Sequence, residues 1–395
     1  MRERITRRQL LQGAGAGAAG ISLAALLVAC GGGGGIEGGG ATETAVGETG
    51  GGKQLADKIV WANWELYIDV AGDDETKHPT IDAFTEATGV EVEYLDGDVN
   101  GNEEFFAKVQ QLLEQGQDVG RDLVVLTDVS GVPGRMIELG YVEKLDKEAI
   151  PNAVNLLDVH KSPAYDPNRD YTMPWVGGMT GIGYNAEKVG GDITSLEQLL
   201  TDPKLKGKVT LLSEMVDTMG LVMLLNGDDP EAVTDEAFDR AIAVVQEAFD
   251  SGQVRQFTYN EYAAMMAQGD VWAAVAWSGD MYQLADPNLR WAQPETGGMI
   301  WTDQFMIPKG REVYTASALI NHYYDPKIAA QLVAGIAYIS PVKGAKEELL
   351  ATDPDFANNV LIFPTEEMLA NAYLFDGQAA NNETYKEKFQ ALLGA

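Results

Sequence analysis

Residues 122–127 have the sequence Asp-Leu-Val-Val-Leu-Thr, a short and nearly continuous apolar run. Such a run is typical of a strand in a parallel sheet that helices cover on both faces. Residues 59–64 and 90–95 have strand character too, the first by an apolar run and the second by alternation. Residues 79–88 and 103–115 carry apolar residues at helical spacing, and a Gly follows each of them. The strand–helix–strand–helix–strand order predicts an α/β fold.

A second unit of the same kind follows along the chain. Its expected strands and helices alternate: strands at 180–184, 208–212, 271–277 and 298–307, and helices at 195–200, 219–225, 236–249 and 261–268. The stretches 174–178 and 307–310 have the character of connections between the two units, so the chain would leave the first unit and later return to it. A length of 395 residues agrees with two or three domains.

The chain is strongly acidic, with 28 Lys and Arg against 60 Asp and Glu and a net charge of −32. This charge argues against nucleic-acid binding, which needs Lys and Arg to neutralise phosphates. It also disfavours docking by charge to anionic lipid. The charge is compatible with a cationic ligand, but it is not evidence for one, because many acidic protein surfaces only keep the protein soluble.

The first 30 residues are predicted to be an export signal. They hold four Arg and one Glu, followed by a mildly apolar run rich in Gly and Ala. Residues 6–12 resemble a twin-arginine signal, and Leu27-Val28-Ala29-Cys30-Gly31 resembles a lipobox whose Cys30 becomes lipidated. Without this signal, the remaining residues 31–395 have a formal net charge of −35, from 24 Lys and Arg against 59 Asp and Glu. Residues 31–56 are expected to form a Gly-rich tether between the anchor and the folded body.

Aromatic and acidic side chains follow the expected strands, with no Lys or Arg among them. In open α/β sheets, ligands bind beyond the carboxyl ends of the strands. Aromatic rings attract ammonium groups through cation–π contacts, and a carboxylate pairs with the charge. The residues concerned predict a site for a small organic cation with two or more amines: Trp64, Glu65, Tyr67, Thr127, Asp128, Glu214, Asp217, Trp277, Asp280, Trp301 and Asp303.

Residues typical of metal or nucleophilic chemistry are scattered or missing. His78, His160 and His322 form no ligand pair, and the one Cys lies in the expected signal. The sequence contains no G-x-S-x-G elbow and no phosphate-binding P-loop. We therefore expect no metal, no cofactor and no enzymatic activity. A carboxylate-based glycosidase using pairs such as Glu214 and Asp217 is the enzymatic alternative.

Five segments resemble the bacterial polyamine-binding proteins of ABC transporters, of the spermidine/putrescine type. The resemblance covers about residues 57–395 in the same order. The segments are Asn63-Trp64-Glu65-Leu66-Tyr67, residues 122–127, Asp170-Tyr171-Thr172-Met173-Pro174-Trp175, Trp277-Ser278-Gly279-Asp280, and residues 297–303 followed by Ile307-Pro308. The elements Trp301-x-Asp303 and Trp277-x-x-Asp280 are the most specific of them.

The resemblance implies a type II periplasmic-binding-protein fold with two α/β lobes, two crossing strands and the ligand in the cleft between the lobes. The lobes would comprise residues 57–174 with 304–345, and 178–303 with 346–395. It implies stacking roles for Trp64, Tyr67, Trp277 and Trp301, and amine-binding roles for Asp303, Asp280, Glu214 and Asp217. Thr127 and Tyr338 match further ligand contacts.

Two departures from the family pattern affect the acids. Leu66 stands where the family usually has an acid, with Glu65 one position earlier, and Asp128 replaces a neutral polar residue. These changes put ligand length and preference in doubt more than ligand class. A sugar or compatible-solute receptor of the same fold is the alternative, since Trp and Tyr also stack on sugars.

The resemblance also implies where the protein is located and which partners it has. The protein would be a monomer, anchored through Cys30 at the outer face of the cytoplasmic membrane, in the periplasm or at the cell surface. It would pass its ligand to the transmembrane subunits of an ABC permease and would bind no nucleic acid.

Overall fold

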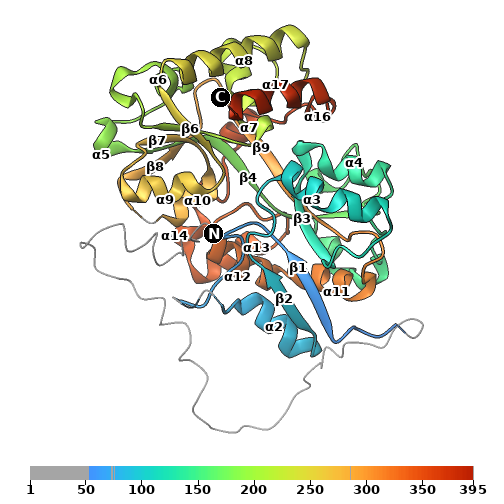
Figure 1. The fold of residues 1–395 in the computed structure, drawn as a ribbon. Coiled ribbons are helices and arrows are strands. Elements are labelled where there is room, and N and C mark those ends of the chain that lie inside the picture. The colour runs from blue at the N-terminus through green and yellow to red at the C-terminus, as the bar shows by residue number, and fades with distance from the viewer. Residues whose placement is uncertain (1–52, 73, 75, 285, 395) are drawn as a thin grey trace, which may run out of the picture.

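The computed structural model describes residues 53–72, 74, 76–284 and 286–394, and within them ten strands form one mixed sheet (Figure 1). The order is β2-β1-β3-β9-β4-β7-β5-β6, with β8 on β4 and β10 on β9. The strands are β1 (Lys58–Ala62), β2 (Glu91–Leu95), β3 (Leu123–Thr127), β4 (Thr172–Asn185), β5 (Val209–Leu212), β6 (Val254–Thr258), β7 (Ala273–Trp277), β8 (Leu289–Ala292), β9 (Gly298–Met306) and β10 (Ala372–Tyr373).

Helices cover both faces of the sheet, as the apolar strands require. They are α2 (Pro79–Thr88), α3 (Asn102–Glu114), α4 (Val132–Glu138), α5 (Ala186–Val189), α6 (Leu196–Thr201), α7 (Met215–Asn226), α8 (Asp235–Asp250), α9 (Glu261–Gln268), α10 (Ser278–Gln283), α11 (Val313–Tyr323), α12 (Pro326–Ile336), α13 (Ala345–Thr352), α14 (Pro354–Ala357), α15 (Glu366–Ala370), α16 (Gly377–Ala380) and α17 (Glu383–Leu393).

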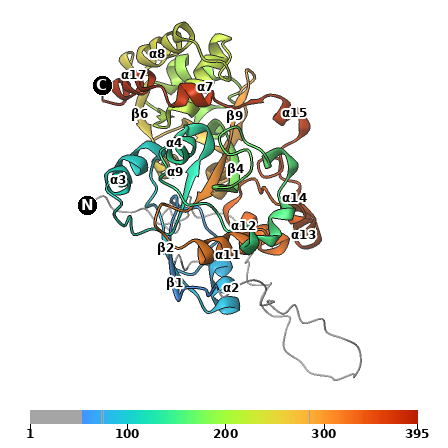
Figure 2. The same cartoon turned by 90° about the vertical axis from the view of Figure 1, so that its right-hand side faces the viewer.

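The molecule has two lobes, which confirms the two-lobe α/β fold. The first lobe contains the parallel strands β1 to β3 with α2, α3, α4, α11 and α12. The second lobe contains the parallel strands β5 to β7 with α6 to α10 and α17. Figure 2 shows α8 and α17 at one end of the molecule and α2 and α11 at the other. Helix α13 packs against α12, so the exact lobe boundaries, including the one expected at residue 345, stay a prediction.

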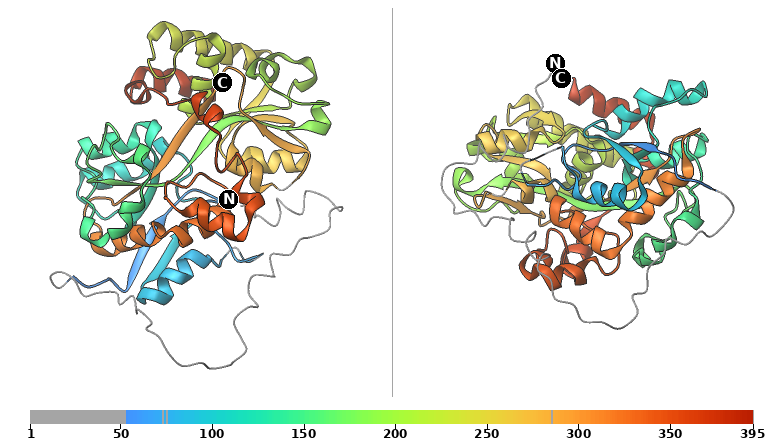
Figure 3. Two further views of the ribbon diagram at one scale, coloured as in Figure 1. Left: turned by 180° about the vertical axis from the view of Figure 1, so that it is seen from behind. Right: turned by 90° about the horizontal axis from the view of Figure 1, so that it is seen from below.

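Two long strands, β4 and β9, cross from one lobe to the other (Figure 3). Residues 303–306 of β9 pair antiparallel with β3 in the first lobe, and residues 180–184 of β4 pair with β7 in the second. Residues 174–178 connect the two lobes, as expected, and they do so as part of the crossing strand β4. Backbone pairing with β9 keeps them extended, with a shift of register between Pro174 and Gly177.

The predicted helices form largely where apolar spacing and caps place them. Helix α2 has Pro79 in its first turn and ends before Gly89, whose φ of 77° suits a left-handed cap. Helix α7 begins at Met215, four residues before the expected start at Met219, and Glu214 occupies its N-cap. Met219 and Met223 of this helix are buried in the core.

The expected export signal, the lipidated Cys30 and residues 31–52 of the tether lie outside the described residues. The described part of the chain contains no helix that is both long and apolar enough to span a bilayer.

Candidate functional site

A cavity lies where the carboxyl ends of β1, β3, β5 and β7 face one another between the lobes. It encloses about 430 Å³ of empty space, part of it open to solvent. This is the location that the strand-end rule predicts for an α/β sheet. The cavity is lined by Trp64, Glu65, Tyr67, Asn102, Thr127, Glu214, Val216, Asp217, Asn260, Trp277, Trp301, Asp303 and Tyr338.

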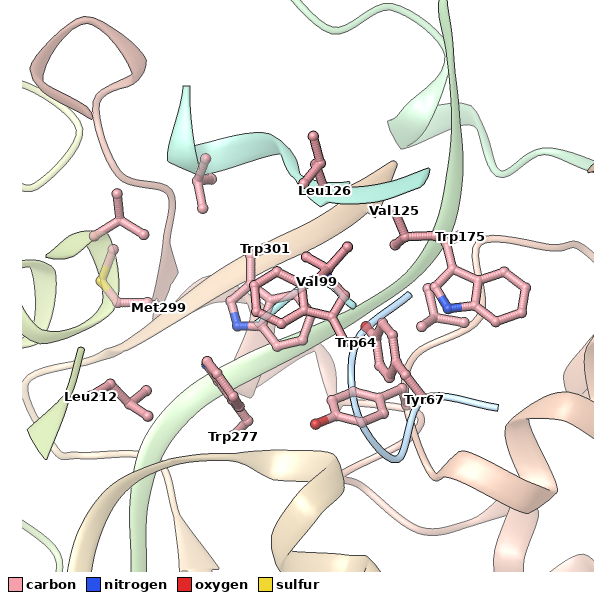
Figure 4. Close-up of a cluster of buried hydrophobic side chains, with 14 of the residues drawn as sticks. Trp64, Tyr67, Val99, Val125, Leu126, Trp175, Leu212, Trp277, Met299 and Trp301 are labelled. Atoms are coloured by element: carbon pink, nitrogen blue, oxygen red, sulfur yellow. The ribbon is translucent and has the colours of Figure 1, made fainter. Parts of the chain in front are cut away.

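Five aromatic rings line this cavity as an aromatic wall, and Figure 4 labels four of them: Trp64, Tyr67, Trp277 and Trp301. The ring of Trp277 lies 6.4 Å from those of both Trp64 and Trp301, at interplanar angles of 76° and 75°. Tyr338 continues the wall, at 5.8 Å from Trp301 and 4.9 Å from Tyr67. All five side chains are buried. Edge-to-face packing holds each ring at an angle to its neighbour, so that ring faces as well as edges line the cavity.

Asp303 provides a buried carboxylate in this aromatic wall. It lies opposite Thr127 in the β3–β9 ladder, and its side chain is 3% exposed. Its Oδ2 accepts a hydrogen bond of 2.5 Å from the Tyr67 hydroxyl. Its Oδ1 is buried and makes no hydrogen bond of normal geometry to a described residue. Burial raises the pKa of Asp303 to about 7, although Tyr67 and the nearby Thr127 hydroxyl counteract this rise.

Asp217 holds two tryptophans in place. It accepts hydrogen bonds from the Thr180 hydroxyl and from Trp277 Nε1, the latter at 3.2 Å. Trp301 Nε1 in turn donates to Thr180 Oγ1 at 3.0 Å. Burial raises the pKa of Asp217 to about 6. The Asp217 carboxylate therefore orients Trp277 and, through Thr180, Trp301, and it is also one of the acids that line the cavity.

Glu214 faces the opposite lobe. Its Oε1 accepts hydrogen bonds from the backbone N–H of Asn102 at 3.2 Å and from Asn102 Nδ2 at 3.3 Å. Burial, followed by repulsion from Asp217 and Glu104, raises the pKa of Glu214 to about 8. The cavity thus contains acids that hold protons near neutral pH when no cation is present.

Ten of the twelve expected site residues line the cavity, and Asp128 and Asp280 do not. Asp128 Oδ1 instead accepts from the backbone N–H groups of Val129 and Thr302, at 2.8 and 3.0 Å. These bonds hold the turn after β3 against β9.

Asp280 lies behind the wall rather than in it. Its carboxylate accepts hydrogen bonds from the hydroxyls of Tyr338 and Tyr262, at 2.7 and 2.8 Å, and from Asn260 Nδ2 at 2.8 Å. Tyr338 and Asn260 both line the cavity. In this structure Asp280 therefore orients lining residues, and its expected contact with a ligand amine stays a prediction.

Asn102, Asn260 and Val216 also line the cavity, in addition to the residues expected from the sequence. Asn102 is the first residue of α3, after β2, and Asn260 is the N-cap of α9, after β6. Both amides follow a strand end, so the strand-end rule extended to β2 and β6 predicts them. Val216 has no polar signal that could have marked it.

Gly178 allows the crossing strand β4 to pass close behind the wall. It pairs with Trp301 in the ladder, and a Cβ here would lie 2.6 Å from Trp301 Cζ2 and 3.1 Å from Tyr338 Cδ1. Gly178→Ala should therefore lower the free energy of unfolding by about 1–3 kcal/mol, the usual cost of overpacking. Denaturant unfolding measures this, with Gly377→Ala as control because a Cβ there meets nothing within 4 Å. Equal stability of the two variants would contradict the packing described.

The described residues contain no group of three or more His, Cys, Asp or Glu placed to hold a metal ion.

Comparison with known families gives a match over residues 80–364 to the model of bacterial extracellular solute-binding proteins. Among curated proteins, the chain is 25% identical over 339 residues to the spermidine/putrescine-binding periplasmic protein of Escherichia coli, covering 85% of this chain and 91% of the relative. It is 28% identical over 369 residues to the putrescine-binding periplasmic protein SpuD of Pseudomonas aeruginosa, covering 86% and 93%.

Solved structures show the same fold. A putative spermidine/putrescine ABC transporter protein from Listeria monocytogenes superimposes with a TM-score of 0.73 at 23% identity, over 85% of this chain and 99% of the other. A binding protein from Agrobacterium tumefaciens, solved with agropinic acid, gives a TM-score of 0.68 at 20% identity, over 87% and 100%. The second likeness means that the fold by itself does not select the ligand.

Proposed function

This chain belongs to the bacterial extracellular solute-binding proteins, in the ABC-transporter group that includes the polyamine-binding proteins, and on that premise we propose that it binds a linear polyamine such as putrescine or spermidine. The observation that carries the proposal is the composition of the cavity lining. Five aromatic side chains and the acids Glu65, Glu214, Asp217 and Asp303 line it, and no Lys, Arg or His is among the lining residues. Such a site attracts cations and repels anions.

The aromatic wall and the acids suit the two parts of a polyamine. Ring faces pack against the methylene chain and attract its ammonium groups, at roughly 0.5–2 kcal/mol for each cation–π contact. Asp303, with Oδ1 buried and Oδ2 held by Tyr67, would accept hydrogen bonds from one terminal amine. Glu214 and Asp217 would neutralise the other. A buried ammonium is tolerable only with such partners.

We place the protein outside the cytoplasmic membrane, anchored through Cys30 and passing its ligand to an ABC permease as a monomer. The support is the sequence of residues 1–52, in which residues 6–12 resemble a twin-arginine signal, residues 27–31 resemble a lipobox and the rest is rich in Gly. Metabolic labelling with a palmitate analogue would test the anchor, since Cys30→Ala should abolish incorporation. Labelling that persists in the variant would overturn it.

A thermal-shift panel tests the ligand class. Putrescine, cadaverine, spermidine, spermine, betaine and sugars are added to the full chain at equal concentrations. A ligand at 100 times its Kd stabilises the folded state by about 2.7 kcal/mol, which is readily measured as a rise in Tm. We expect stabilisation by polyamines alone. A rise with betaine or a sugar and none with polyamines would contradict the proposal.

A neutral polyol or sugar is the second candidate. One observation favours it: the indole Nε1 of Trp64, a lining residue, is buried without a hydrogen bond to any described residue. A hydroxyl oxygen could accept from this donor, whereas an ammonium group could not. The same panel separates the two candidates.

A further inference from the structure

The first turn of α3 contacts the second lobe at three consecutive residues. Asn102 donates its backbone N–H and its Nδ2 to Glu214 Oε1, as described above. Glu103 Oε1 pairs with Lys386 Nζ of α17 at 3.0 Å. Glu104 Oε1 accepts a hydrogen bond of 2.5 Å from the Tyr259 hydroxyl. These second-lobe groups come from the start of α7, from α17 and from the segment after β6.

The contact is both close and charged. A Cβ on Gly101 would lie 2.1 Å from Glu104 Oε2 and 2.8 Å from the Tyr259 hydroxyl, so the Glu104–Tyr259 pair packs directly against the backbone of Gly101. Arg135 of α4 donates to Glu103 Oε2 at 2.6 Å, and Lys386 also pairs with Glu383 at 3.0 Å. Figure 1 shows α17 of the second lobe beside α3 and α4 of the first. Lys386 is only 13% exposed, so the ion pair to Glu103 is partly shielded from solvent.

The contact also reaches the cavity. Asn102 and Glu214 both line it, and Asn102 is only 2% exposed. Asn102 binds the first lobe as well, since its Oδ1 accepts from the Thr127 N–H at 2.8 Å and its Nδ2 donates to Thr127 Oγ1 at 3.1 Å. Glu214 therefore receives its partner only when the second lobe lies against α3.

We propose that the first turn of α3 is a clasp that holds the two lobes closed, and that Asn102 is the positioning residue that fixes Glu214 at the wall of the cavity on closure. The clasp consists of Asn102, Glu103 and Glu104 with their partners Glu214, Lys386 and Tyr259. It does not depend on which ligand the cavity takes. Its expected effect on ligand release does rest on the proposed function.

The test uses a double variant outside the cavity, Lys386→Met with Tyr259→Phe. Each substitution removes one polar contact between the lobes and keeps most of the side chain. The matched control is Lys388→Met with Tyr184→Phe. Lys388 pairs with Asp239 of α8, and the Tyr184 hydroxyl donates to Asp192 at 3.0 Å, so both contacts lie within the second lobe.

Two measurements on the full chain decide the matter. Small-angle scattering without ligand should give a larger radius of gyration for the clasp variant than for wild type and control. Stopped-flow release of putrescine should be about three- to ten-fold faster in the clasp variant, because closing contacts act mainly on dissociation. A clasp variant that matches the control in both measurements would overturn the proposal. If putrescine does not bind the wild type, the proposed function fails, and scattering alone still decides the clasp.

A third variant tests the positioning role of Asn102. The groups facing Glu214 are Asp217 on its own helix, Glu104 and Asn102 of α3, and Tyr259, and of these Asn102 lowers the pKa of Glu214. Asn102→Ala should move the midpoint of the pH profile of putrescine affinity upward, which loss of stability alone would not do. Asn102→Gln should restore part of the shift. An unchanged midpoint would leave Asn102 without the role assigned to it.

Discussion

Asp303→Asn should weaken putrescine binding by about 1.5–3 kcal/mol, or roughly 10- to 150-fold, the range for a hydrogen bond to a charged group. The substitution keeps the size of the side chain and can still accept from Tyr67, whose hydroxyl lies 2.5 Å from Oδ2. It removes the negative charge and replaces one acceptor by an amide donor. The buried Oδ1 of Asp303 makes no normal hydrogen bond to any residue that the structure describes, so it can accept one from a ligand ammonium. Isothermal titration calorimetry measures the change.

Asp128→Asn is the matched control. Asp128 lies near Asp303 and raises its pKa through the field of its charge, but it does not line the cavity. Its Oδ1 accepts from two backbone N–H groups, and the amide oxygen of Asn can still accept from both, so the variant should keep the local structure and most of the affinity. Equal affinity of Asp303→Asn and wild type would show that this carboxylate does not bind the amine. Equal loss in both variants would show that only the general negative field matters.

Putrescine should bind at least roughly ten-fold more weakly at pH 6 than at pH 8. Burial raises the pKa of Asp217 to about 6, of Asp303 to about 7 and of Glu214 to about 8. Below these values the acids are protonated, and a bound ammonium must displace the protons. Each proton released near its pKa costs up to ten-fold in affinity per pH unit. Binding therefore releases protons, and the affinity for putrescine rises as the pH rises from 6 to 8.

Calorimetry in buffers of different ionisation enthalpy counts the protons released at pH 7. Glu214→Gln should release fewer protons than the wild type and show a shallower pH profile. The same raised pKa values predict that the ligand-free protein loses stability as the pH rises from about 5 to 8, because the folded state must then hold buried charges. A pH-independent affinity with no proton release would contradict the electrostatics described for the cavity.

The sequence predicted the architecture because the signals were periodic and local. Side chains of a strand point alternately to its two faces, so burial of one or both faces leaves a recognisable sequence pattern. The apolar run at residues 122–127 and the alternation at residues 90–95 are such patterns, and both segments form strands of the sheet. Residues 174–178 were harder to predict. They contain Pro and two Gly and do connect the lobes, as expected, but pairing with β9 makes this connection part of a long strand. Long-range backbone pairing outweighs local propensity there.

The site was predictable where a residue ends a strand, and less so where hydrogen bonds decide its direction. Trp301 and Asp303 are two residues apart in β9, and both face the cavity, as strand alternation requires. Asp280 follows Trp277 at the end of β7 in the same way, but three donors from other elements turn its carboxylate away from the lining. The hydrogen bond between Asn102 and Glu214 joins residues that are 112 positions apart in the sequence, so no local sequence pattern could predict it.

The most direct test of the cationic-ligand proposal compares putrescine with 1,4-butanediol by calorimetry on the wild-type chain at pH 8. The two molecules share a four-carbon chain, and only the diamine carries charge. We predict saturable one-to-one binding of putrescine and at least a hundred-fold weaker binding of the diol, about 2.7 kcal/mol. Equal binding of the two, or binding of the diol alone, would contradict a site built for a cation.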